Sequence, residues 1–448
     1  MFTKIKLTNF RSFDNLEFDL TAKNGNPKHL AVVFGENGAG KSNLMSSFVF
    51  LQEIFATMDV RDFYEELLSK EAIYIDEKLE KRRKDLIKDG LRDIQAIIND
   101  YRMVGCEEPI NLEYHFQING NLGKYIISLD DSEIIYEKLE YLLNKRRGVY
   151  FECSRSEIIL NNNLVKEKDL LNDIKASAKR FWGKHSIIAI ILHEVTDKSK
   201  SYVFDNISDN FKCVLDLLTT VSCCLKTGSR RWNSLYSPID VFESPSKGIL
   251  KCEKEYELDL AESVLSDFFT SINSNINKVY YEREYNDKLI KYTLYFEKFI
   301  SGQYRQIPFS KESTGNYQLL RIFSYIISSS LGGVVAIDEA DSGIHDYLFQ
   351  KILHKIVPHI NGQLIMTTHN TMLMESDFSK NSTYILKEEF EKMVIKAISE
   401  HDKRIYTKNN IRNKYLNGEY GGLPKTSDIN FKELIESIYN AIKPLEEI

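Results

Sequence analysis

The residues with the clearest chemical pattern form one glycine-rich stretch, Gly35 to Ser42, which reads Gly-Glu-Asn-Gly-Ala-Gly-Lys-Ser. This is the spacing G-x-x-x-x-G-K-[ST], in which glycines let backbone N–H groups approach phosphate oxygens that a side chain would block. Lys41 is placed to reach the β- and γ-phosphates of ATP, and the Ser42 hydroxyl to bind Mg²⁺. The nucleotide-binding residues predicted around this loop are Asn37, Gly38, Ala39, Gly40, Lys41, Ser42 and Asn43.

A pair of acids follows a second apolar run. Val334 to Ile337 is a short buried-strand pattern, and Asp338 and Glu339 come directly after it. Ligands bind at the carboxyl ends of parallel strands, so an acidic pair at this point predicts chemistry rather than a surface turn. We expect Asp338 to hold Mg²⁺ through water and Glu339 to act as the general base on the attacking water.

A histidine ends the next apolar strand. Gln363 to Thr367 is the apolar run, and His369 stands just beyond its carboxyl end. A lone histidine is usually a structural residue, but this one follows the strand after the acidic pair. We therefore predict that His369 senses the γ-phosphate during catalysis.

A second anion site is predicted ahead of the acidic strand, in the stretch "FSKESTGNYQLLRI". Ser313 and Gly315 open a helix there, and a hydroxyl with free N–H groups at a helix start attracts anions. The chain already has one phosphate loop at Gly35 to Ser42. We therefore expect the Ser313 site to complete the nucleotide site of a facing subunit.

The elements that must position these residues are also visible in the sequence. Leu30 to Phe34 is a continuous apolar run, typical of a strand in a parallel sheet covered on both faces. A helix follows it from Ser42 to Phe55, and residues 170–269 are mostly helical, with a polar loop at Thr227 to Ser237. Further strands are predicted at Lys4 to Leu7, at Leu16 to Leu20, in a β-meander over 110–151, and in a hairpin from Leu289 to Phe309 that bends at Ser301-Gly302.

The predicted organisation is an α/β ATPase head interrupted by helical segments. The head contains residues 1–55 with the phosphate loop, a β-meander over 106–160, and residues 281–400 with the acidic strand and His369. A helical insertion is expected over 56–105, a helical lid domain over 161–280 and a tail over 401–448. Within the insertion, Leu86, Leu91, Ile94 and Ile98 form one apolar stripe. That stripe indicates either packing on the side of the head or a helical hairpin that contacts a partner.

Composition limits the classes of function. The chain has 448 residues, enough for two or three compact units. A net charge of −6 gives no overall attraction to nucleic acid or to an anionic membrane. No run approaches 18 apolar residues and the start carries no apolar leader segment, so neither membrane insertion nor export is expected. Six cysteines without a C-x-x-C pair indicate reduced thiols and a cytoplasmic location.

In this order, the four motifs resemble the ATP-binding-cassette ATPase superfamily, specifically its soluble branch with chromosome-structure and recombination proteins. The opening "KIKLTNFRSF" is similar to the start of that branch, and the resemblance places Arg11 near the nucleotide. It implies a P-loop ATPase head of the cassette type, with a mixed sheet, an antiparallel β-meander and helical insertions. It also implies hydrolysis of ATP with Mg²⁺ and a dimer that sandwiches ATP, with a higher homo-oligomer as a further option.

The signature "ESTGNYQ", the sequence "DEADSGIH" and the tail "NKYLNGEYGGLP" resemble the ATPases of bacterial antiphage loci. These include the overcoming-lysogenization-defect, Septu, PARIS and abortive-infection ATPases. His345 stands where many cassettes have the acid of the D-loop. Gln52 and Gln117 are both weak candidates for the Q-loop glutamine.

The resemblance implies a sensor or regulator subunit of an abortive-infection system. Residues 370–448 carry no acidic triad on successive apolar strands, so a fused nuclease is not expected. The expected partner is therefore a separate effector protein, with a nuclease as the leading kind. The alternative is a RecF-like repair or recombination ATPase that binds DNA, which would need a band of lysine and arginine. The dense basic clusters are Lys81 to Lys84 and Ser229 to Trp232, so direct nucleic-acid binding stays open.

Overall fold

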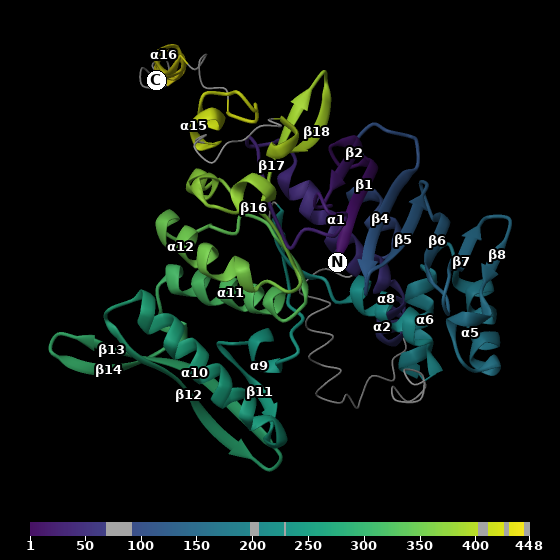
Figure 1. Ribbon diagram of the computed structural model, residues 1–448, viewed down its shortest axis with the longest axis horizontal. Coiled ribbons are helices and arrows are strands. Elements are labelled where there is room, and N and C mark those ends of the chain that lie inside the picture. Colours follow the sequence, from purple (N-terminus) through teal and green to yellow (C-terminus); the bar gives the residue numbers. More distant parts are fainter. Residues whose placement is uncertain (69–91, 198–205, 228–229, 402–410, 425–429, 443–448) are drawn as a thin grey trace.

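The computed structural model describes residues 1–68, 92–197, 206–227, 230–401, 411–424 and 430–442. At its centre is a mixed sheet with the order β10-β9-β15-β16-β3-β17-β18 (Figure 1). The five inner strands run parallel, and β10 and β18 are antiparallel at the two edges. The strands are β3 (Leu30–Phe34), β9 (Ser222–Thr227), β10 (Arg230–Ser234), β15 (Val334–Ile337), β16 (Gln363–Thr367), β17 (Thr383–Glu389) and β18 (Lys392–Ala397).

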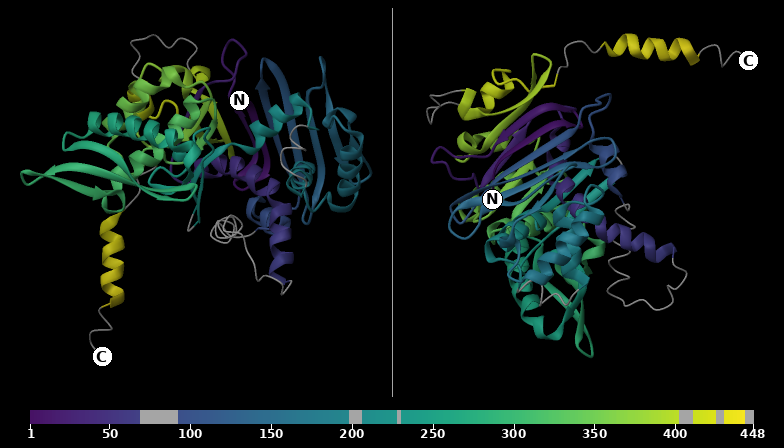
Figure 2. Two further views of the ribbon diagram at one scale, coloured as in Figure 1. Left: turned by 90° about the horizontal axis from the view of Figure 1, so that it is seen from below. Right: turned by 90° about the vertical axis from the view of Figure 1, so that its right-hand side faces the viewer.

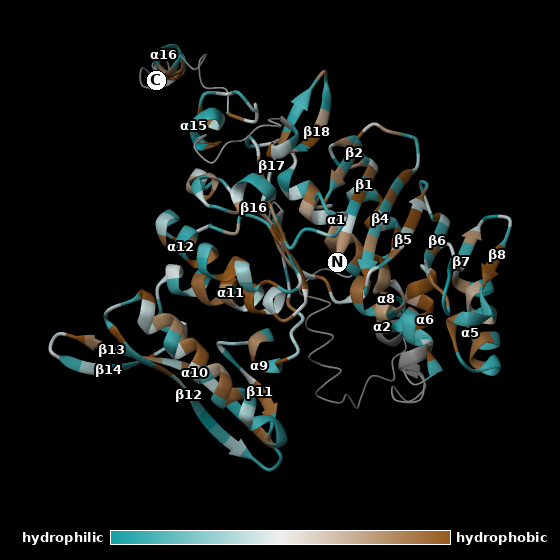
Figure 3. Ribbon diagram, viewed as in Figure 1, coloured by the Kyte–Doolittle hydropathy of each residue, from teal (hydrophilic) through white to brown (hydrophobic). Residues whose placement is uncertain are grey.

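The central sheet separates two hydrophobic cores. Along β3, Ala31 and Val33 face one core, whereas Leu30, Val32 and Phe34 face the other. Helix α1 (Lys41–Phe55) fills the first core, and α11 (Thr314–Ser330) and α12 (Asp346–Ile356) contribute to the second. This two-sided burial explains why β3, β15 and β16 are continuous apolar runs rather than alternating ones. Figure 3 shows α11 as a largely hydrophobic helix beside the sheet.

A second sheet, antiparallel throughout, packs on α1 with the order β2-β1-β4-β5-β6-β7-β8. Phe2 lies edge-on to Phe48 of α1, with ring centroids 5.6 Å apart, and the Tyr114 hydroxyl donates to the Ser47 carbonyl at 2.6 Å. The predicted β-meander is therefore confirmed. Its strands are β1 (Phe2–Phe10), β2 (Phe13–Asp19), β4 (Ile110–Ile118), β5 (Asn121–Leu129), β6 (Ile134–Leu142), β7 (Arg147–Ser154) and β8 (Ile158–Leu160).

A third sheet lies beside α10 (Glu255–Ile272), in the lower left of Figure 1. It contains β11 (Lys247–Lys251), β12 (Ile276–Asn286), β13 (Leu289–Ile300) and β14 (Gln303–Pro308). The hairpin predicted from Leu289 to Phe309 is present. Ser301 and Gly302 both have positive φ, 52° and 81°, which is the backbone that a tight two-residue hairpin turn requires.

The remaining helices surround these sheets, and none of the helices in the described ranges is long and apolar enough to cross a bilayer. Helix α16 projects away from the other elements in both panels of Figure 2. These helices are α2 (Thr57–Leu68), α4 (Ile94–Tyr101), α5 (Lys168–Phe181), α6 (Ile187–Asp197), α8 (Asp209–Thr219), α9 (Asp240–Glu243), α13 (Ser379–Ser382), α14 (Ile398–His401), α15 (Ile411–Leu416) and α16 (Phe431–Ile442).

The sequence prediction was wrong in one segment. The stretch Thr227 to Ser237 was expected to be a polar loop, but Arg230–Ser234 forms strand β10 and pairs with β9. Strand β9 in turn pairs with β15, so the region 161–280 contributes two strands to the central sheet besides its helices. The domain boundaries themselves stay predictions. The stripe positions Leu86 and Leu91 and the cluster Lys81 to Lys84 lie outside the described residues.

One buried carboxylate links the β-meander to α6. Glu137 on β6 is fully buried and accepts hydrogen bonds from the Tyr125 hydroxyl at 3.0 Å, the Trp182 indole at 3.2 Å and the Ile187 backbone N–H at 2.8 Å. Burial raises the pKa of Glu137 to about 7, although these donors oppose the shift. Because the folded state holds this proton more tightly than the unfolded state, it binds more protons between about pH 4.5 and pH 7.

We expect the stability contribution of Glu137 to be fully present below about pH 4.5 and to be lost as the pH rises through about 7. Glu137→Gln keeps the acceptor for Ile187 and removes the titration. Its free energy of unfolding should lose a pH dependence on the order of 3 kcal/mol across that window, measured by urea denaturation. Glu152→Gln on neighbouring β7 is the control and should keep the wild-type slope from pH 4.5 to 7. An unchanged slope in Glu137→Gln would contradict this assignment.

Candidate functional site

The phosphate-loop stretch lies between β3 and α1, as predicted. Gly38 and Gly40 have φ of 85° and 94°, conformations that L side chains rarely adopt. Gly35 is needed for a different reason, since a Cβ there would lie 2.5 Å from the Leu386 carbonyl oxygen on β17. The exposed tip of the loop is formed by Asn37 and Gly38, while Ala39 is buried.

The start of α1 is open to an anion. Gly40 occupies the N-cap position and supplies no capping side chain, so first-turn N–H groups remain available to a phosphate. Lys41 is 7% exposed, and its ammonium donates to the carbonyls of Gly35 and Glu36, both at 2.9 Å. Burial lowers the pKa of Lys41, and the nearby carboxylates, Asp338 first among them, oppose that shift. The loop therefore combines a cation and backbone donors within one turn.

The turn between β1 and β2 supports the phosphate loop from outside. The Asn43 side-chain amide donates to the Ser12 hydroxyl at 2.8 Å, and a Cβ on Gly40 would meet the Ser12 Oγ at 2.8 Å. The same Cβ on Gly40 would lie 3.0 Å from the nearest atom of the Phe13 ring. Ser12 was not singled out from the sequence, because only the folded turn brings it to the loop.

Arg11 precedes this contact, but its side chain points to α4. Its guanidinium pairs with Asp100 at 2.8 Å and lies 4.7 Å from the centre of the Tyr101 ring. Arg92 pairs with the same Asp100 at 3.0 Å and with the buried Glu53 of α1 at 2.7 Å. The contact of Arg11 with a nucleotide thus stays an expectation from the resemblance, and its described ionic partner is Asp100.

The acidic pair stands where β15 ends. Asp338 is 8% exposed and accepts a hydrogen bond from the Thr367 hydroxyl at 2.6 Å. The same hydroxyl accepts the backbone N–H of Glu339 at 2.8 Å. Glu339 is exposed and has a φ of 48°, a conformation that costs a residue with a side chain about 1–3 kcal/mol and that clusters at functional sites. Thr367 therefore holds the Asp338 carboxylate and the Glu339 backbone at once.

The side chains available to a divalent cation are a carboxylate and a hydroxyl. Asp338 is held beside Lys41, which feels the charge of both Asp338 and Glu339. Ser42 is the first residue after Lys41 and is partly exposed in the first turn of α1. Oxygen ligands of this kind suit Mg²⁺, which keeps several waters and also binds phosphate oxygens. The donor set therefore fits a Mg²⁺ ion held jointly by Ser42, Asp338 and a nucleotide.

His369 lies near the same groups. Burial lowers its pKa, and the Lys41 ammonium lowers it further against the opposing effect of Asp341, Glu339 and Asp338. The imidazole is consequently neutral at pH 7, and one ring nitrogen can donate a hydrogen bond to a phosphate oxygen without carrying charge. Its neighbour Asn370 donates from its side-chain amide to the Asp346 carbonyl at 2.9 Å, which ties the His369 loop to the start of α12.

The predicted second anion site is an exposed helix start. Ser313 is the N-cap of α11 and accepts the Asn316 N–H at 3.3 Å. A Cβ on Gly315 would lie 3.6 Å from the Gly343 carbonyl oxygen, so this helix start packs on the loop that follows the acidic pair. Asn316 and the ion pair of Lys298 with Glu312, at 2.7 Å, support the turn from beneath. The described contacts of Ser313 and Gly315 thus lie in their own part of the chain.

The weaker candidates from the sequence have structural roles. Gln52 lies within α1, donating to the Ser234 hydroxyl at 2.8 Å and to the Val221 carbonyl, so it holds β9 and β10 against α1. Gln117 ends β4, and its side chain donates to the Gly120 carbonyl in the adjacent turn. His345 caps α12 by accepting the Tyr347 N–H at 3.2 Å. None of these described contacts involves the acidic pair.

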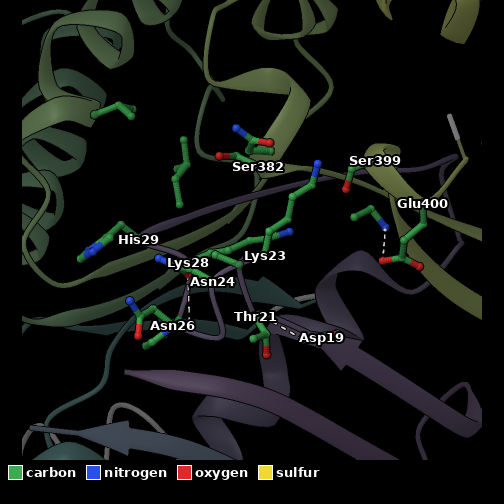
Figure 4. Close-up of a pocket in the computed structure, with 16 residues that line it drawn as sticks. Asp19, Thr21, Lys23, Asn24, Asn26, Lys28, His29, Ser382, Ser399 and Glu400 are labelled. Atoms are coloured by element: carbon green, nitrogen blue, oxygen red, sulfur yellow. Dashed lines mark hydrogen bonds between the residues drawn. The ribbon is translucent and has the colours of Figure 1, made fainter. Parts of the chain in front are cut away.

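A cavity of about 800 Å³ lies at the amino ends of the parallel strands of the central sheet, where β3 and β17 begin (Figure 4). Lys23, Lys28, Ser382 and Glu400 are among the residues that line it. Lys28 is engaged there with the Tyr384 hydroxyl at 2.6 Å. Because parallel strands place their carboxyl ends at the other edge, this cavity is separate from the phosphate loop.

Part of the chain matches the model of a known protein family. Residues 228–375 match the family AAA_21, described as "AAA domain, putative AbiEii toxin, Type IV TA system". The matched region includes Ser313, Gly315 and the acidic pair but not the phosphate loop. No curated protein sequence is significantly similar to the chain.

Several solved structures match most of the chain at low identity and with TM-scores below 0.5. A structure of an SMC head bound to the C-winged helix domain of ScpA is 14% identical, covering 90% of this chain and 99% of that one with a TM-score of 0.44. The SMC head domain from Thermotoga maritima is 15% identical, with coverages of 89% and 98% and a TM-score of 0.36. The structure described as the "recombination mediator protein RecF-ATPrS in RecFOR pathway" is 10% identical, with coverages of 89% and 98% and a TM-score of 0.35.

We expect Thr367→Val to raise the Mg²⁺ concentration that ATP hydrolysis requires, because it removes the hydroxyl that bonds the Asp338 carboxylate and the Glu339 backbone N–H while keeping the side-chain shape. Loss of such a supporting hydrogen bond typically costs 10–100-fold in metal affinity or activity. Hydrolysis would be followed during a Mg²⁺ titration, and nucleotide binding without Mg²⁺ should be unchanged. The control is Thr219→Val on α8, where the hydroxyl bonds only within its own helix. A wild-type Mg²⁺ titration for Thr367→Val would refute the role of this hydroxyl.

Proposed function

We propose that this protein is an ATPase that dimerises around ATP and serves as the sensor or regulator subunit of an antiphage, abortive-infection defence system. In this proposal it controls a separate effector, and a nuclease is the leading kind. The observation that carries the ATPase is the set of groups around Lys41. A lysine, an oriented carboxylate at Asp338 and an exposed acid at Glu339 belong to one edge of one sheet.

The residues of the chain divide the work of hydrolysis. Lys41 and the N–H groups at the start of α1 bind and orient the phosphates of ATP. Ser42 and Asp338 would hold Mg²⁺, which would neutralise charge on the phosphate oxygens when bound. Glu339 accepts a proton from the attacking water, a role that typically contributes about 10²–10⁴-fold to the rate. His369, neutral at pH 7, donates a hydrogen bond to the γ-phosphate.

The dimer is supported by the exposed helix start at Ser313. A chain needs one phosphate loop to bind ATP, and this chain has a second helix start, at Ser313, whose dipole would attract an anion. Gly315 leaves this helix start free of a bulky side chain, and the 17 residues of α11 add a dipole directed at it. We therefore place Ser313 and Gly315 of one copy against the γ-phosphate bound by the other copy.

The defence role is supported by the matched family and by the tail motif. The matched family is described with a toxin of a type IV toxin–antitoxin system, and the matched region contains the acidic pair. A regulatory subunit also needs a surface for its effector, and α16 presents apolar side chains that are each more than half exposed. They are Phe431, Leu434, Ile435, Ile438 and Tyr439. In this proposal the effector is a separate chain.

The alternative function, a RecF-like DNA-binding ATPase, finds less support on the antiparallel sheet. Its outer lysines are paired with acids across neighbouring strands, as in Lys4 with Glu17 at 2.6 Å and Lys124 with Glu113 at 3.0 Å. Paired lysines have fewer counterions to release on binding a phosphate backbone. The antiphage function is therefore the preferred proposal.

The shared site predicts the behaviour of mixed dimers. Ser313→Arg should bind ATP as a monomer with nearly unchanged affinity but lose ATP-dependent dimerisation and most hydrolysis. Lys41→Ala should lose nucleotide binding. In a mixed dimer of the two variants, one composite site pairs the intact phosphate loop of the Ser313→Arg chain with the intact Ser313 of the Lys41→Ala chain, and the other composite site carries both changes.

Since one site in the mixed dimer is whole, hydrolysis should partly recover when the two variants are combined. Hydrolysis would be measured across mixing ratios at constant total protein. An absence of recovery at every mixing ratio would mean that each chain completes its own site, and the shared-site dimer would then be wrong.

A further inference from the structure

The tail motif singled out in the sequence packs directly on the nucleotide-binding edge of the sheet. Residues 411–424, called here the C-terminal strap, begin with α15 and end in a glycine turn. The ring of Tyr415 lies 6.0 Å from that of Phe34, the last residue of β3. The Tyr415 hydroxyl donates to the Gly422 carbonyl at 2.9 Å, which closes the strap on itself.

The glycines of the strap permit this close approach. Gly421 and Gly422 have φ of 73° and 75°. A Cβ on Gly422 would lie 2.9 Å from the Ile385 side chain and 3.6 Å from the Cα of Gly35, the first residue of the phosphate loop. A Cβ on Gly421 would lie 2.9 Å from the Lys387 side chain. One end of the strap is therefore fitted against the phosphate loop and β17.

The other end of the strap holds the loop that follows His369. The Arg412 guanidinium donates from Nε to the Thr371 hydroxyl at 3.1 Å and from Nη1 to the Glu375 carboxylate at 2.9 Å. Thr371 and Glu375 begin and end the short helical turn that comes directly after Asn370. Asn370 caps this turn by accepting the Met372 N–H at 3.0 Å. Arg412 thus binds both ends of the helical turn that follows His369.

We infer that Arg412 is a positioning residue for hydrolysis, acting through His369, and that the strap couples the His369 loop to the phosphate loop. This inference rests on the proposed ATPase function and assigns a role to the tail motif. The strap contacts Phe34 and Gly35 at one end and Thr371 and Glu375 at the other. Movement of either loop is consequently transmitted to the other.

If Arg412 had a purely structural role, its removal would lower stability rather than the rate of hydrolysis. The Arg412 and Glu375 side chains are 35% and 39% exposed, and such half-exposed ion pairs contribute only about 0–1 kcal/mol to stability. Removing Arg412 should therefore leave the fold intact. A positioning role instead predicts a loss in the rate of hydrolysis with little change in nucleotide affinity or melting temperature.

The test uses Arg412→Met and Arg412→Lys in the full chain. We expect Arg412→Met to lower kcat for ATP about 10-fold or more while its Kd for ATP and its melting temperature stay at wild-type values. Arg412→Lys should fall between wild type and Arg412→Met, because an ammonium cannot reproduce the two-pronged contact of a guanidinium. The matched control is Arg147→Met, which breaks a half-exposed arginine–glutamate pair with Glu140 in the β-meander and should hydrolyse ATP normally.

A double-mutant cycle identifies the route through His369. In a His369→Ala background, Arg412→Met should cause little further loss of kcat, because the side chain that it positions is already gone. Additive losses, or an unchanged kcat in the single variant, would overturn the inference. A wild-type protein that binds ATP without hydrolysing it would instead refute the proposed function. The two failures are therefore distinguishable.

Discussion

The parallel pairing of β15, β16 and β3 is the constraint on which the rest of the structure depends. Its register sets Ile337 beside Met366, and Met366 beside Val32. As a result, the acidic pair, the His369 loop and the phosphate loop all leave the sheet at one edge. The alternating burial of these strands in two separate cores holds that register, because a slip by one residue would exchange the two sets of side chains. Packing of these strands in the two cores thus brings the residues of the site together.

Residues distant in the sequence support this end of the sheet from two sides. On one side, the β1–β2 turn places Ser12 and Phe13 against Gly40, and α4 fixes that turn through the pair of Arg11 with Asp100. On the other side, the C-terminal strap contacts Gly35 and the loop after His369. Both supports come from segments that carry no catalytic motif. Helix α4 and the C-terminal strap therefore support the phosphate loop from two sides.

Much of the candidate site was predictable because its motifs are local. The phosphate loop, the acidic pair and His369 each follow an apolar run within a few residues, and the spacing alone implies their place at strand ends. The strand β10 was missed because Arg230–Ser234 is polar and its partner β9 is short, so pairing rather than hydrophobicity defines it. The roles of Thr367 and Arg412 depend on contacts to Asp338 and Glu375 that the chain brings together only on folding.

The central claim is that ATP joins two copies of this chain across their exposed Ser313 sites. The most direct test is the mass in solution of Glu339→Gln, which keeps the phosphate loop but lacks the general base. With Mg²⁺ and ATP, light scattering coupled to size exclusion should report twice the mass measured with ADP or without nucleotide. A variant that binds ATP tightly and keeps the same mass in all three conditions would contradict the account.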